Sequence, residues 1–588
     1  MSSYASIILT TSLVLSLSVP GYSMLFNTPR NMNNATKRVS GMIWPILTFG
    51  ITFAVFVRIL QVTLPALPPV SSLFTTSLTS DRAIFSKGYS GPEWHAPRGT
   101  DINDLSKALD GSGPMAQKVV PKTGAGGSEQ PEGWNYADYN YCNMPHVTKQ
   151  EYEEKGEEWE LVFVEVIQRH HKRTPYATST FPHETYAWYC DDAQLYQFGR
   201  PNPLDRTSAT GFWHIIDNDE QSMTGQTSKV NPFVAPGFAG TCQFPQITYG
   251  GLHDSWQHGK DLHDVYHDLL HIIPDAPSEA DLADPKNPFH KQVRFRVTNN
   301  PITSQVAGMA LNGMFGITGA YPLDIQPKAI DSLEPSYDCP RFQQLSQDYG
   351  PGSSFLNSPA SPSRTRWLDH LRATAPLFAR LDAISGVDPA HRTFHQSWDH
   401  YFDSLSSRLC HSKPIPCSTS DPDDDRCITQ AEAEEVFRLG MWEYSHIYRD
   451  APESLSASAA SMGVWLAELS QHLKDAAAGA SELKYMHNVA HDGSISRLLS
   501  ALQVDVMVWP GLGSEIVFEL FRKKMRTVEE MGSPLSGYHI RVLWSGRALQ
   551  SSSPALGNVD MLPLEDFLGY VDGLVGVRAS KVKEMCGR

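Results

Sequence analysis

Residues 160–167 (ELVFVEVI) are mostly β-branched and apolar, and a run of basic residues follows them directly. An apolar run of this length predicts a strand that is buried on both faces, as in a sheet covered by helices on each side. The next residues, 168–175, read QRHHKRTP. Ligands of open α/β sheets bind at the carboxyl ends of the strands. We therefore expect an α/β domain that presents clustered positive charge at one edge of its sheet.

Other segments indicate the same fold class. Three further strands are expected at 293–297, 507–509 and 539–544. Helical periodicity covers 257–272, 306–317, 367–385, 430–442 and 461–477. Strands that are separated by helices favour an α/β domain with a mostly parallel sheet. The stretch 330–480 has almost no strand pattern, which predicts a helical insertion.

The N-terminal part of the chain differs from the rest. Residues 39–57 form a 19-residue uncharged stretch, which as a helix reaches about 28 Å, close to the hydrocarbon thickness of a bilayer. Arg30, Lys37 and Arg38 precede this stretch. By the positive-inside rule these residues stay cytosolic and the bulk of the chain crosses the membrane. We expect a single-pass, type II-like anchor, with the remaining chain in the secretory-pathway lumen or outside the cell.

Two alternatives remain open for this region. The stretch 39–57 could instead be a buried core helix, and the apolar run 7–19 could be a signal peptide or a second span. The basic residues lie between the two runs. A second span would therefore keep them cytosolic and leave the expected location of the C-terminal part unchanged.

The composition excludes several classes of protein. Apolar residues make up 41% of the chain and charged residues 19%, which excludes a disordered chain, collagen and a small disulfide-rich protein. The formal charge of −16, from 48 basic and 64 acidic residues, argues against nucleic acid as the partner. Eight cysteines, all after the anchor, form an even set that would pair in an oxidising lumen. No C-x-x-C occurs, so the sequence does not support a zinc ribbon.

The basic segment contains a histidine between two arginines. Arg169 and Arg173 are spaced so that both guanidinium groups can converge on one tetrahedral dianion. His170, which lies between them, would attack phosphorus if its other ring nitrogen is held. The alternative interpretation is a solvated basic turn, which is the interpretation that the string favours when it is taken in isolation.

The segment RHHKRTP resembles the R-H-G-x-R-x-P motif of the histidine acid phosphatases, the second branch of the phosphoglycerate-mutase-like superfamily. Further segments resemble motifs of that family in the family's order: 246–270, 485–502 (YMHNVAHDGSISRLLSAL), 509–520 (WPGLGSEIVFEL), 542–547 and 562–568. The matches span residues 160–570 of 588. The anchor combined with this fold resembles fungal-type and 2-phosphoxylose-phosphatase-like members of the family.

The resemblance implies a role for each matching residue. His170 would be the nucleophile that forms a phosphohistidine, and Asp492 the general acid. The phosphate-binding residues would be Arg169, Arg173, His491 and Arg296. Asp492 must be partly protonated, which implies an acidic optimum or a pKa raised by desolvation. The reaction would need no cofactor and no metal, and its substrate would be a small phosphomonoester or a phosphorylated glycan.

The resemblance also implies a phosphoglycerate-mutase-like three-layer α/β domain with a mostly parallel sheet and a helical cap insertion. We expect the chain to divide into an N-terminal cytosolic segment at 1–38, the transmembrane anchor at 39–58, a stem or linker at 59–158, the first part of the α/β core at 159–329, the cap at 330–480 and the second part of the core at 481–588.

The chain departs from the family pattern at three positions. His171 replaces the glycine after the nucleophile, where close backbone approach is usual. In the segment 296–307 (RVTNNPITSQVA), Ile302 stands where a second phosphate-binding arginine is expected, and Val306 where a serine is expected. The candidates for supplying the missing charge are Arg296, Arg294 and Lys172. Two functions are therefore expected: an acid phosphatase that acts through a phosphohistidine, or a catalytically weak or inactive member that serves as a lumenal phosphate-ligand binding or scaffold protein.

A metal site is a further alternative. His263, His267 and His271 recur one helical turn apart, and neutral imidazoles in such an arrangement chelate zinc or copper. A solvated polar helix face explains the same pattern without a metal. The acidic loop 421–425 lacks the spacing and the glycine of an EF-hand. We expect no metal at either place.

Overall fold

The structure is a computed structural model of the 588-residue chain. It describes residues 91–113, 139–183, 186–193, 195–201, 208–213, 238–284, 286–317, 321–355, 361–418, 427–524 and 535–588. The chain divides into two units, Met1–Ser86 and Lys87–Arg588, and all described residues belong to the second. The expected cytosolic segment, the anchor, part of the stem and the acidic loop 421–425 lie outside the described residues. No described helix is both long and apolar enough to cross a membrane.

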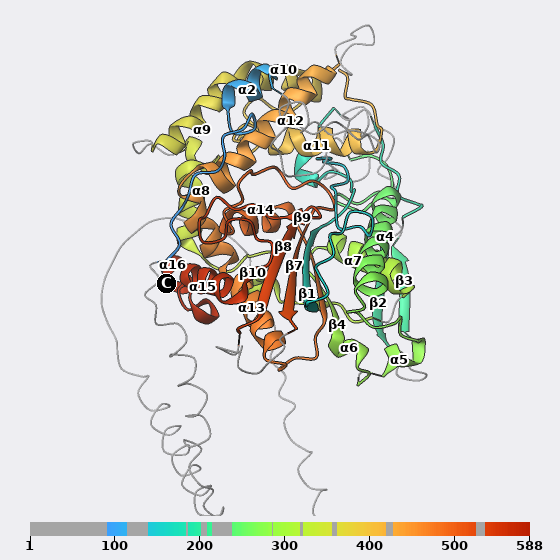
Figure 1. The fold of residues 1–588 in the computed structure, drawn as a ribbon. Helices are drawn as coiled ribbons and strands as arrows, with labels where there is room; N and C mark the ends of the chain where they lie inside the picture. The colour runs from blue at the N-terminus through green and yellow to red at the C-terminus, as the bar shows by residue number, and fades with distance from the viewer. Residues whose placement is uncertain are drawn as a thin grey trace, which may run out of the picture. The chain divides into compact units, whose positions relative to one another are not determined.

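An eight-stranded mixed sheet forms the centre of the second unit (Figure 1). Its strands are β1 Trp159–Arg169, β4 Val293–Val297, β5 Asp324–Ile325, β6 Tyr485–Ala490, β7 Glu515–Lys523, β8 Tyr538–Trp544, β9 Arg547–Ala548 and β10 Leu562–Pro563. Their order is β10–β8–β7–β1–β6–β4–β5, and β9 pairs with β8. The pairs from β1 to β5 are parallel, whereas β1–β7 and β7–β8 are antiparallel. The predicted α/β class is confirmed, and the parallel half of the sheet contains the strand that leads into the basic segment.

Helices cover both faces of this sheet. Those that cover it most directly are α4 Tyr249–His263, α7 Pro301–Phe315, α13 Ser454–Ala477 and α15 Leu564–Val575. The remaining helices are α2 Leu105–Asp110, α5 Glu279–Ala283, α6 Phe289–Gln292, α8 Pro340–Tyr349, α9 Pro362–Ala373, α10 Ala375–Ser385, α11 Asp399–Cys410, α12 Gln430–Ser445, α14 Asp492–Ala501 and α16 Val582–Met585. In Figure 1, α9 to α12 gather beyond one end of the sheet. A separate hairpin joins β2 Leu195–Pro201 to β3 Ser208–Trp213.

Alternate residues of β1 belong to two different cores. Phe163 and Ile167 pack in the core that includes α13 and α15, whereas Val164 and Val166 pack in the core that includes α4 and α7. Successive side chains of a strand point to opposite faces, so both faces of β1 are covered. This arrangement explains why residues 161–167 of the strand are apolar on both faces, with Glu165 as the exception.

The predicted strands at 160–167, 293–297 and 539–544 are confirmed as β1, β4 and β8. The strand predicted at 507–509 is wrong, because this segment joins no sheet. Its apolar character reflects burial among aromatic side chains, since the ring of Trp509 stacks on the ring of Phe402 at a centroid distance of 3.9 Å.

Strand β6 is absent from the expected strands because its sequence, YMHNVA, places two polar residues in a buried position. His487 and Asn488 are fully buried, and side chains of β1 bind the Nε2 of His487 and the amide N–H of Asn488. The ring Nε2 of His487 lies 2.7 Å from Oε1 of Gln168, and the amide of Asn488 donates to Glu165 at 3.1 Å. Only the assembled sheet supplies these partners.

The predicted helices are confirmed with different bounds. The helix expected at 257–272 is α4 followed by a π-helical turn, Asp264–Leu269. The helix expected at 367–385 is divided into α9 and α10 at Thr374, because Pro376 has no N–H to donate to the carbonyl of Arg372 and its ring crowds that carbonyl, so it fits only in the first turn of a new helix. Between 330 and 480, the described residues form helices and no strand.

All eight cysteines form disulfides, which confirms the expected pairing. The bonds are Cys142–Cys410, Cys190–Cys242, Cys339–Cys586 and Cys417–Cys427. Two of them join residues that are 268 and 247 positions apart in the sequence. They link the helical part of the chain to segments that flank the sheet strands at both ends.

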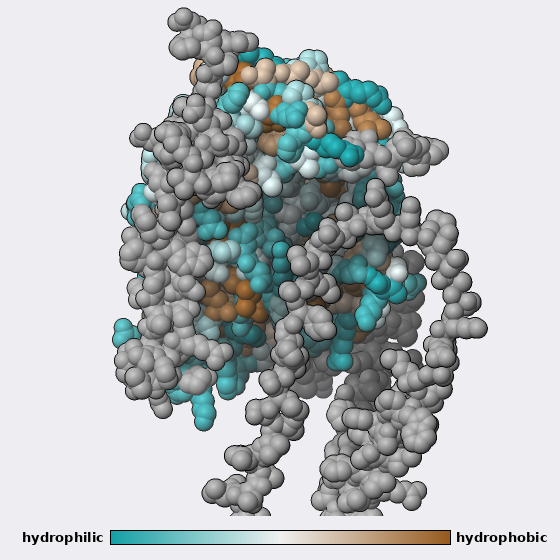
Figure 2. Space-filling model, turned by 180° about the vertical axis from the view of Figure 1, so that it is seen from behind, coloured by the Kyte–Doolittle hydropathy of each residue, from teal (hydrophilic) through white to brown (hydrophobic). Residues whose placement is uncertain are grey.

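The surface is mixed in character. Figure 2 shows the molecule from behind, where hydrophilic residues predominate between separate hydrophobic patches. Among the described residues, the exposed large hydrophobic ones are Tyr189, Tyr249, Ile325, Ile330 and Val577. They belong to different segments of the chain.

Candidate active site

The basic segment is held by both neighbours of β1 as it leaves the sheet. The backbone N–H of Arg169 donates to the carbonyl of Ser514 at 2.8 Å, just before β7. The backbone N–H of His170 donates to the carbonyl of Ala490 at 3.1 Å, at the end of β6. The residues Arg169, His170 and Arg173 are at most 5% exposed. The solvated basic turn is therefore excluded.

The ring of His170 is fixed in one orientation. Its Nδ1 lies 3.0 Å from the carbonyl oxygen of His171. Because a carbonyl oxygen only accepts, Nδ1 carries the proton and Nε2 presents a lone pair. The Nε–H of Arg173 points at this lone pair from 3.5 Å. His170 thus has the tautomer that a nucleophile needs.

The surroundings of His170 keep it uncharged. Burial, then the charges of Arg173 and Arg169, and then His491, lower the pKa of His170 well below its usual value. A neutral imidazole retains its lone pair in mildly acidic solution. This is the protonation state from which attack on phosphorus starts.

Each of the two arginines forms an ion pair with a carboxylate. Nη2 of Arg169 lies 2.8 Å from Oδ2 of Asp492, and its Nη1 donates to the carbonyl of Pro510. Nη1 of Arg173 lies 2.8 Å from Oδ1 of Asp403. Asp403 comes from α11, and it was absent from the expected site because 230 residues separate it from Arg173. The ion pairs fix both guanidinium groups before any substrate arrives.

His491 lies beside His170. His491 directly follows β6, and its ring centroid is 5.5 Å from that of His170. Its Nε2 is 3.0 Å from Oγ1 of Thr298, which follows β4. Burial lowers the pKa of His491 to about 4, against the opposing charge of Asp492. Three neighbouring parallel strands therefore bring their carboxyl ends together around one place.

Asp492 is the first residue of α14 and is held from two sides. Its Oδ2 accepts from Nε1 of Trp509 at 2.9 Å and pairs with Arg169. Burial acts to raise the pKa of Asp492, but the charge of Arg169, the Trp509 hydrogen bond and the charge of Arg173 outweigh it, and the pKa is lowered. Of the two expectations for this residue, a pKa raised by desolvation is wrong, and an acidic optimum remains.

The bulky ring of His171 fits because a glycine faces it from another segment. A Cβ added to Gly513 would lie 2.4 Å from Cε1 of His171, and Gly513 has a φ of +75°, which favours glycine. The ring points into a polar core, where its Nε2 is 2.9 Å from the side chain of Gln168 and 3.2 Å from Nδ1 of His258. The His171 side chain therefore points away from Arg169, His170 and Arg173 and does not obstruct the space between them.

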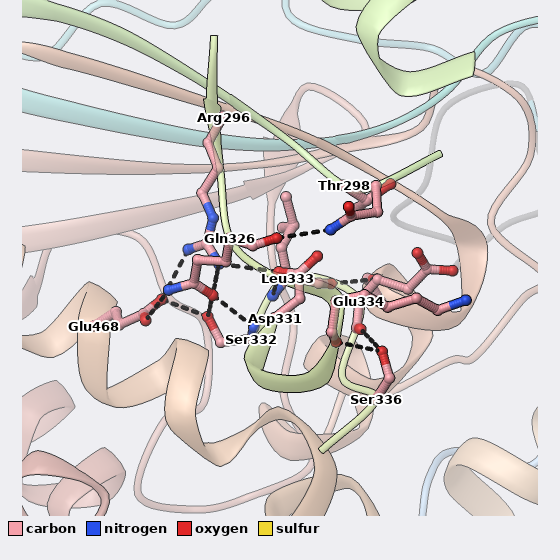
Figure 3. Close-up of polar contacts among 12 residues, drawn as sticks. Arg296, Thr298, Gln326, Asp331, Ser332, Leu333, Glu334, Ser336 and Glu468 are labelled. Atoms are coloured by element: carbon pink, nitrogen blue, oxygen red, sulfur yellow. Dashed lines mark hydrogen bonds and ion pairs between the residues drawn. The ribbon is translucent and has the colours of Figure 1, made fainter. Parts of the chain in front are cut away.

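Arg296 has other partners than a phosphate. Its Nη1 lies 2.8 Å from Oε2 of Glu468, and its Nη2 lies 3.2 Å from Oδ1 of Asp331 (Figure 3). Nη2 also donates to Gln326 and Ser332 at 2.7 and 2.8 Å. The network ties the segment after β5 to α13. We assign Arg296 to this network, which differs from the expected role.

The remaining candidates for the missing charge are also paired. Arg294 forms an exposed ion pair with Asp324 at 2.7 Å, and Lys172 pairs with Asp254 at 2.9 Å. Ile302 itself is fully buried in the apolar core that includes α4 and α7. An arginine at this position would place an unpaired charge in that core.

The structure brings together part of the histidine cluster on α4. Ligating atoms of His263, His267 and Asp268 lie within 4.8 Å of one another, whereas His271 is not in the group. Both ring nitrogens of His267 already contact carboxylates, those of Asp268 and Asp275. No residue of the cluster belongs to the site around His170.

A second acidic side chain, Asp399, lies near the site and was not expected from the sequence. It begins α11, one turn before Asp403. Asp399 is accessible to solvent but enclosed by neighbouring side chains. The resulting desolvation, followed by the charges of Asp403, Asp492 and Glu443, raises the pKa of Asp399 to about 7.

Comparison with other proteins gives one curated relative and several solved structures. No protein-family model matches the chain. The 2-phosphoxylose phosphatase 1 of Danio rerio is 25% identical over 203 residues, which are 31% of this chain and 40% of the relative. The match thus spans less than half the length of that relative.

Three of the similar solved structures are phytases. The Klebsiella sp. ASR1 enzyme has 13% identity and a TM-score of 0.39, over 72% of this chain and 95% of that chain. The Hafnia alvei enzyme has 12% identity and a TM-score of 0.40, over 72% of this chain and 99% of that chain. The enzyme from D. castellii has 13% identity and a TM-score of 0.39, over 76% of this chain and 87% of that chain. At these values the similarity transfers no activity to this chain.

Proposed function

We propose that this chain, a member of the histidine acid phosphatase family, hydrolyses phosphomonoesters through a phosphohistidine intermediate. The observation that carries the proposal is the state of His170. Its ring is buried, unprotonated at Nε2 and flanked by the guanidinium groups of Arg169 and Arg173 at the end of β1. These are the parts that phosphoryl transfer to a histidine requires.

In the first step, Nε2 of His170 attacks phosphorus, and the bond between phosphorus and the leaving oxygen breaks. Arg169, Arg173 and His491 surround the charge that spreads over the remaining phosphoryl oxygens. The carboxyl group of Asp492 gives its proton to the leaving oxygen. The products of this step are the free alcohol, a phosphorylated imidazole and the Asp492 carboxylate.

In the second step, a water molecule attacks the phosphorus of the intermediate. The Asp492 carboxylate takes one proton from this water, the bond between phosphorus and Nε2 breaks, and inorganic phosphate leaves. His170 regains its lone pair at Nε2, and Asp492 regains its proton. The lowered pKa of Asp492 makes the protonated form scarce at neutral pH. The cycle therefore favours an acidic medium.

The substrate that we favour is a phosphorylated sugar or glycan. The curated relative is named for a phosphorylated xylose. Aromatic rings border the general acid, since Trp509 donates to Asp492 and Tyr444 stacks on Trp509 at 3.9 Å. The ring of Trp509 is itself buried and stacks on both Phe402 and Tyr444, so it positions the Asp492 carboxyl and does not offer a face to a sugar. No observation on the described residues favours the alternative of a non-catalytic binding or scaffold protein.

We place the catalytic part in the secretory-pathway lumen or outside the cell, with 39–58 as the anchor and 330–480 as the cap. The four disulfides support an oxidising compartment. Protease added to intact microsomes should leave the bulk of the chain intact until detergent is present. Digestion without detergent would place the chain in the cytosol.

The nucleophile is tested by trapping the intermediate. Full-length wild-type protein, incubated with a radiolabelled phosphomonoester and quenched, should carry an acid-labile, base-stable label. His170→Ala should lose the label, and His253→Ala, a change at an exposed residue of α4, should retain it. A label of wild-type size on His170→Ala would show that another residue is the nucleophile.

A further inference from the structure

Arg497 is a cation that forms no ion pair with any described residue. It lies on α14, and it is half-buried. Its Nε is buried without a hydrogen-bond partner, and within the described part of the chain the guanidinium forms neither a hydrogen bond nor an ion pair. Arg169, Arg173 and Arg296 all pair with carboxylates. The Nε of Arg169 and the Nε of Arg296 are likewise buried without a partner, but the terminal nitrogens of these two arginines are paired. Those of Arg497 are not, so an anion from outside the chain is expected to pair with them.

The guanidinium of Arg497 turns back toward the start of α14. A Cβ added to Gly493 would lie 2.9 Å from its Nη1 and 4.0 Å from Oη of Tyr448. The glycine next to the general acid therefore leaves the space that the guanidinium occupies. The group also lies over the rings of Phe342 and Tyr448, at 5.3 and 5.9 Å from their centroids. These rings hold the side chain in position without neutralising its charge.

The electrostatic neighbours of Arg497 place it outside the centre of the site. The cations that lower the pKa of His491 are Arg173 and Arg169. Arg497 instead acts on Glu334, where it opposes the burial and the Asp331 charge that raise the pKa of that carboxyl. Oε2 of Glu334 lies 3.6 Å from Nε2 of His491. The position of Arg497 is thus at the border of the phosphate site, on the side where Asp492 protonates the leaving group.

We propose that Arg497 binds an anionic group, such as a carboxylate, a sulfate or a second phosphate, on the part of the substrate that leaves. This proposal rests on the proposed phosphatase function. Three carboxyl groups, those of Glu334, Asp399 and Asp492, surround the same region. Without Arg497 they would repel a second anion, and with Arg497 a charged contact replaces that repulsion.

The test compares two substrates that differ by one charge. Phenyl phosphate and carboxyphenyl phosphate have the same reacting group, and kcat/KM for each is measured with full-length protein in detergent. Arg497→Met, which keeps the chain length over Phe342 and Tyr448, should lower the ratio of carboxyphenyl to phenyl phosphate by about ten-fold or more. Arg497→Lys should lower it less, because the charge remains.

The control is Arg341→Met on α8, where an exposed arginine donates only to Gln344. The ratio should stay at its wild-type value in this variant. An unchanged ratio in Arg497→Met, or an equal loss for both substrates, would overturn the proposal. If the wild type hydrolyses neither substrate, the proposed function fails, and calorimetric binding of the two compounds still decides the role of Arg497. Equal affinity for both in wild type and Arg497→Met would then refute it.

Discussion

Replacing Asp403 by asparagine should destabilise the protein and at the same time tighten its binding of inorganic phosphate. Oδ1 of Asp403 lies 2.8 Å from Nη1 of Arg173, and Oδ2 accepts from the backbone N–H of Tyr176 at 2.8 Å. Both members of the ion pair are nearly buried. Removing one partner of such a pair costs about 3–5 kcal/mol. Asparagine keeps the shape and one acceptor, so we expect a loss of about 1.5–3 kcal/mol.

The gain in phosphate affinity follows from the same geometry. In the wild type, the Asp403 carboxylate shares Arg173 with the incoming dianion and repels it. Two unit charges about 6 Å apart interact by roughly 2–3 kcal/mol at an effective dielectric constant of 20. Removing this repulsion should lower the phosphate Kd by ten-fold or more. Phosphate should therefore stabilise Asp403→Asn more than it stabilises the wild type.

The assay is thermal unfolding of full-length protein with and without phosphate, together with calorimetric measurement of the phosphate Kd. Asp382→Asn is the matched control, because this buried carboxylate of α10 pairs with His395 at 3.0 Å and accepts from Tyr401. It should destabilise the protein without changing the phosphate Kd. If phosphate affinity is equal or weaker in Asp403→Asn, Arg173 does not hold the phosphate and the assignment of the site is wrong.

The titration of buried groups and the absence of a metal from the proposed reaction give three further predictions. The kcat/KM should fall as pH rises from 4 to 7, because Asp492 loses its proton, and Asp492→Asn should be at least about 100-fold slower; an optimum above pH 7 would contradict this. Stability should fall on acidification. The buried rings of His487 and His491 have a pKa of about 3 and about 4, below the unfolded value of 6.5, so their contribution is complete above about pH 6.5 and is lost as pH falls toward these values. A Tm that rises on acidification would oppose this. EDTA should leave activity unchanged, and loss with rescue by Zn²⁺ would point to His263 and His267.

The residues that could be predicted from the sequence are those whose neighbours in the chain determine their place. Arg169, His170 and Arg173 follow a strand that its own composition identifies, and His491 and Asp492 follow the adjacent strand in the same short segment. The rest depends on contacts across the fold. Asp403 meets Arg173 only because α11 packs over the end of β1, from 230 residues away.

Two departures from the family pattern show the same limit. A comparison made one position at a time predicts that His171 is a steric obstacle. In the structure, Gly513 on another segment leaves the space that the ring of His171 occupies. The replacement of an expected arginine by Ile302 predicted that the phosphate site lacks one charge. In the structure, Ile302 is part of an apolar core. Among the described residues, Arg497 is a half-buried cation without a hydrogen bond or ion pair, and the sequence pattern alone did not single it out.

The two long disulfides have a topological consequence for the chain. Cys142–Cys410 and Cys339–Cys586 enclose stretches of sequence that overlap between positions 339 and 410. Any single peptide-bond cut between residues 142 and 586 therefore falls inside at least one enclosed stretch. The two fragments stay joined by a covalent bond, so a nicked molecule runs as one species on a non-reducing gel and separates only after reduction. A proteolytic cut in this part of the protein does not by itself release the cap helices from the sheet.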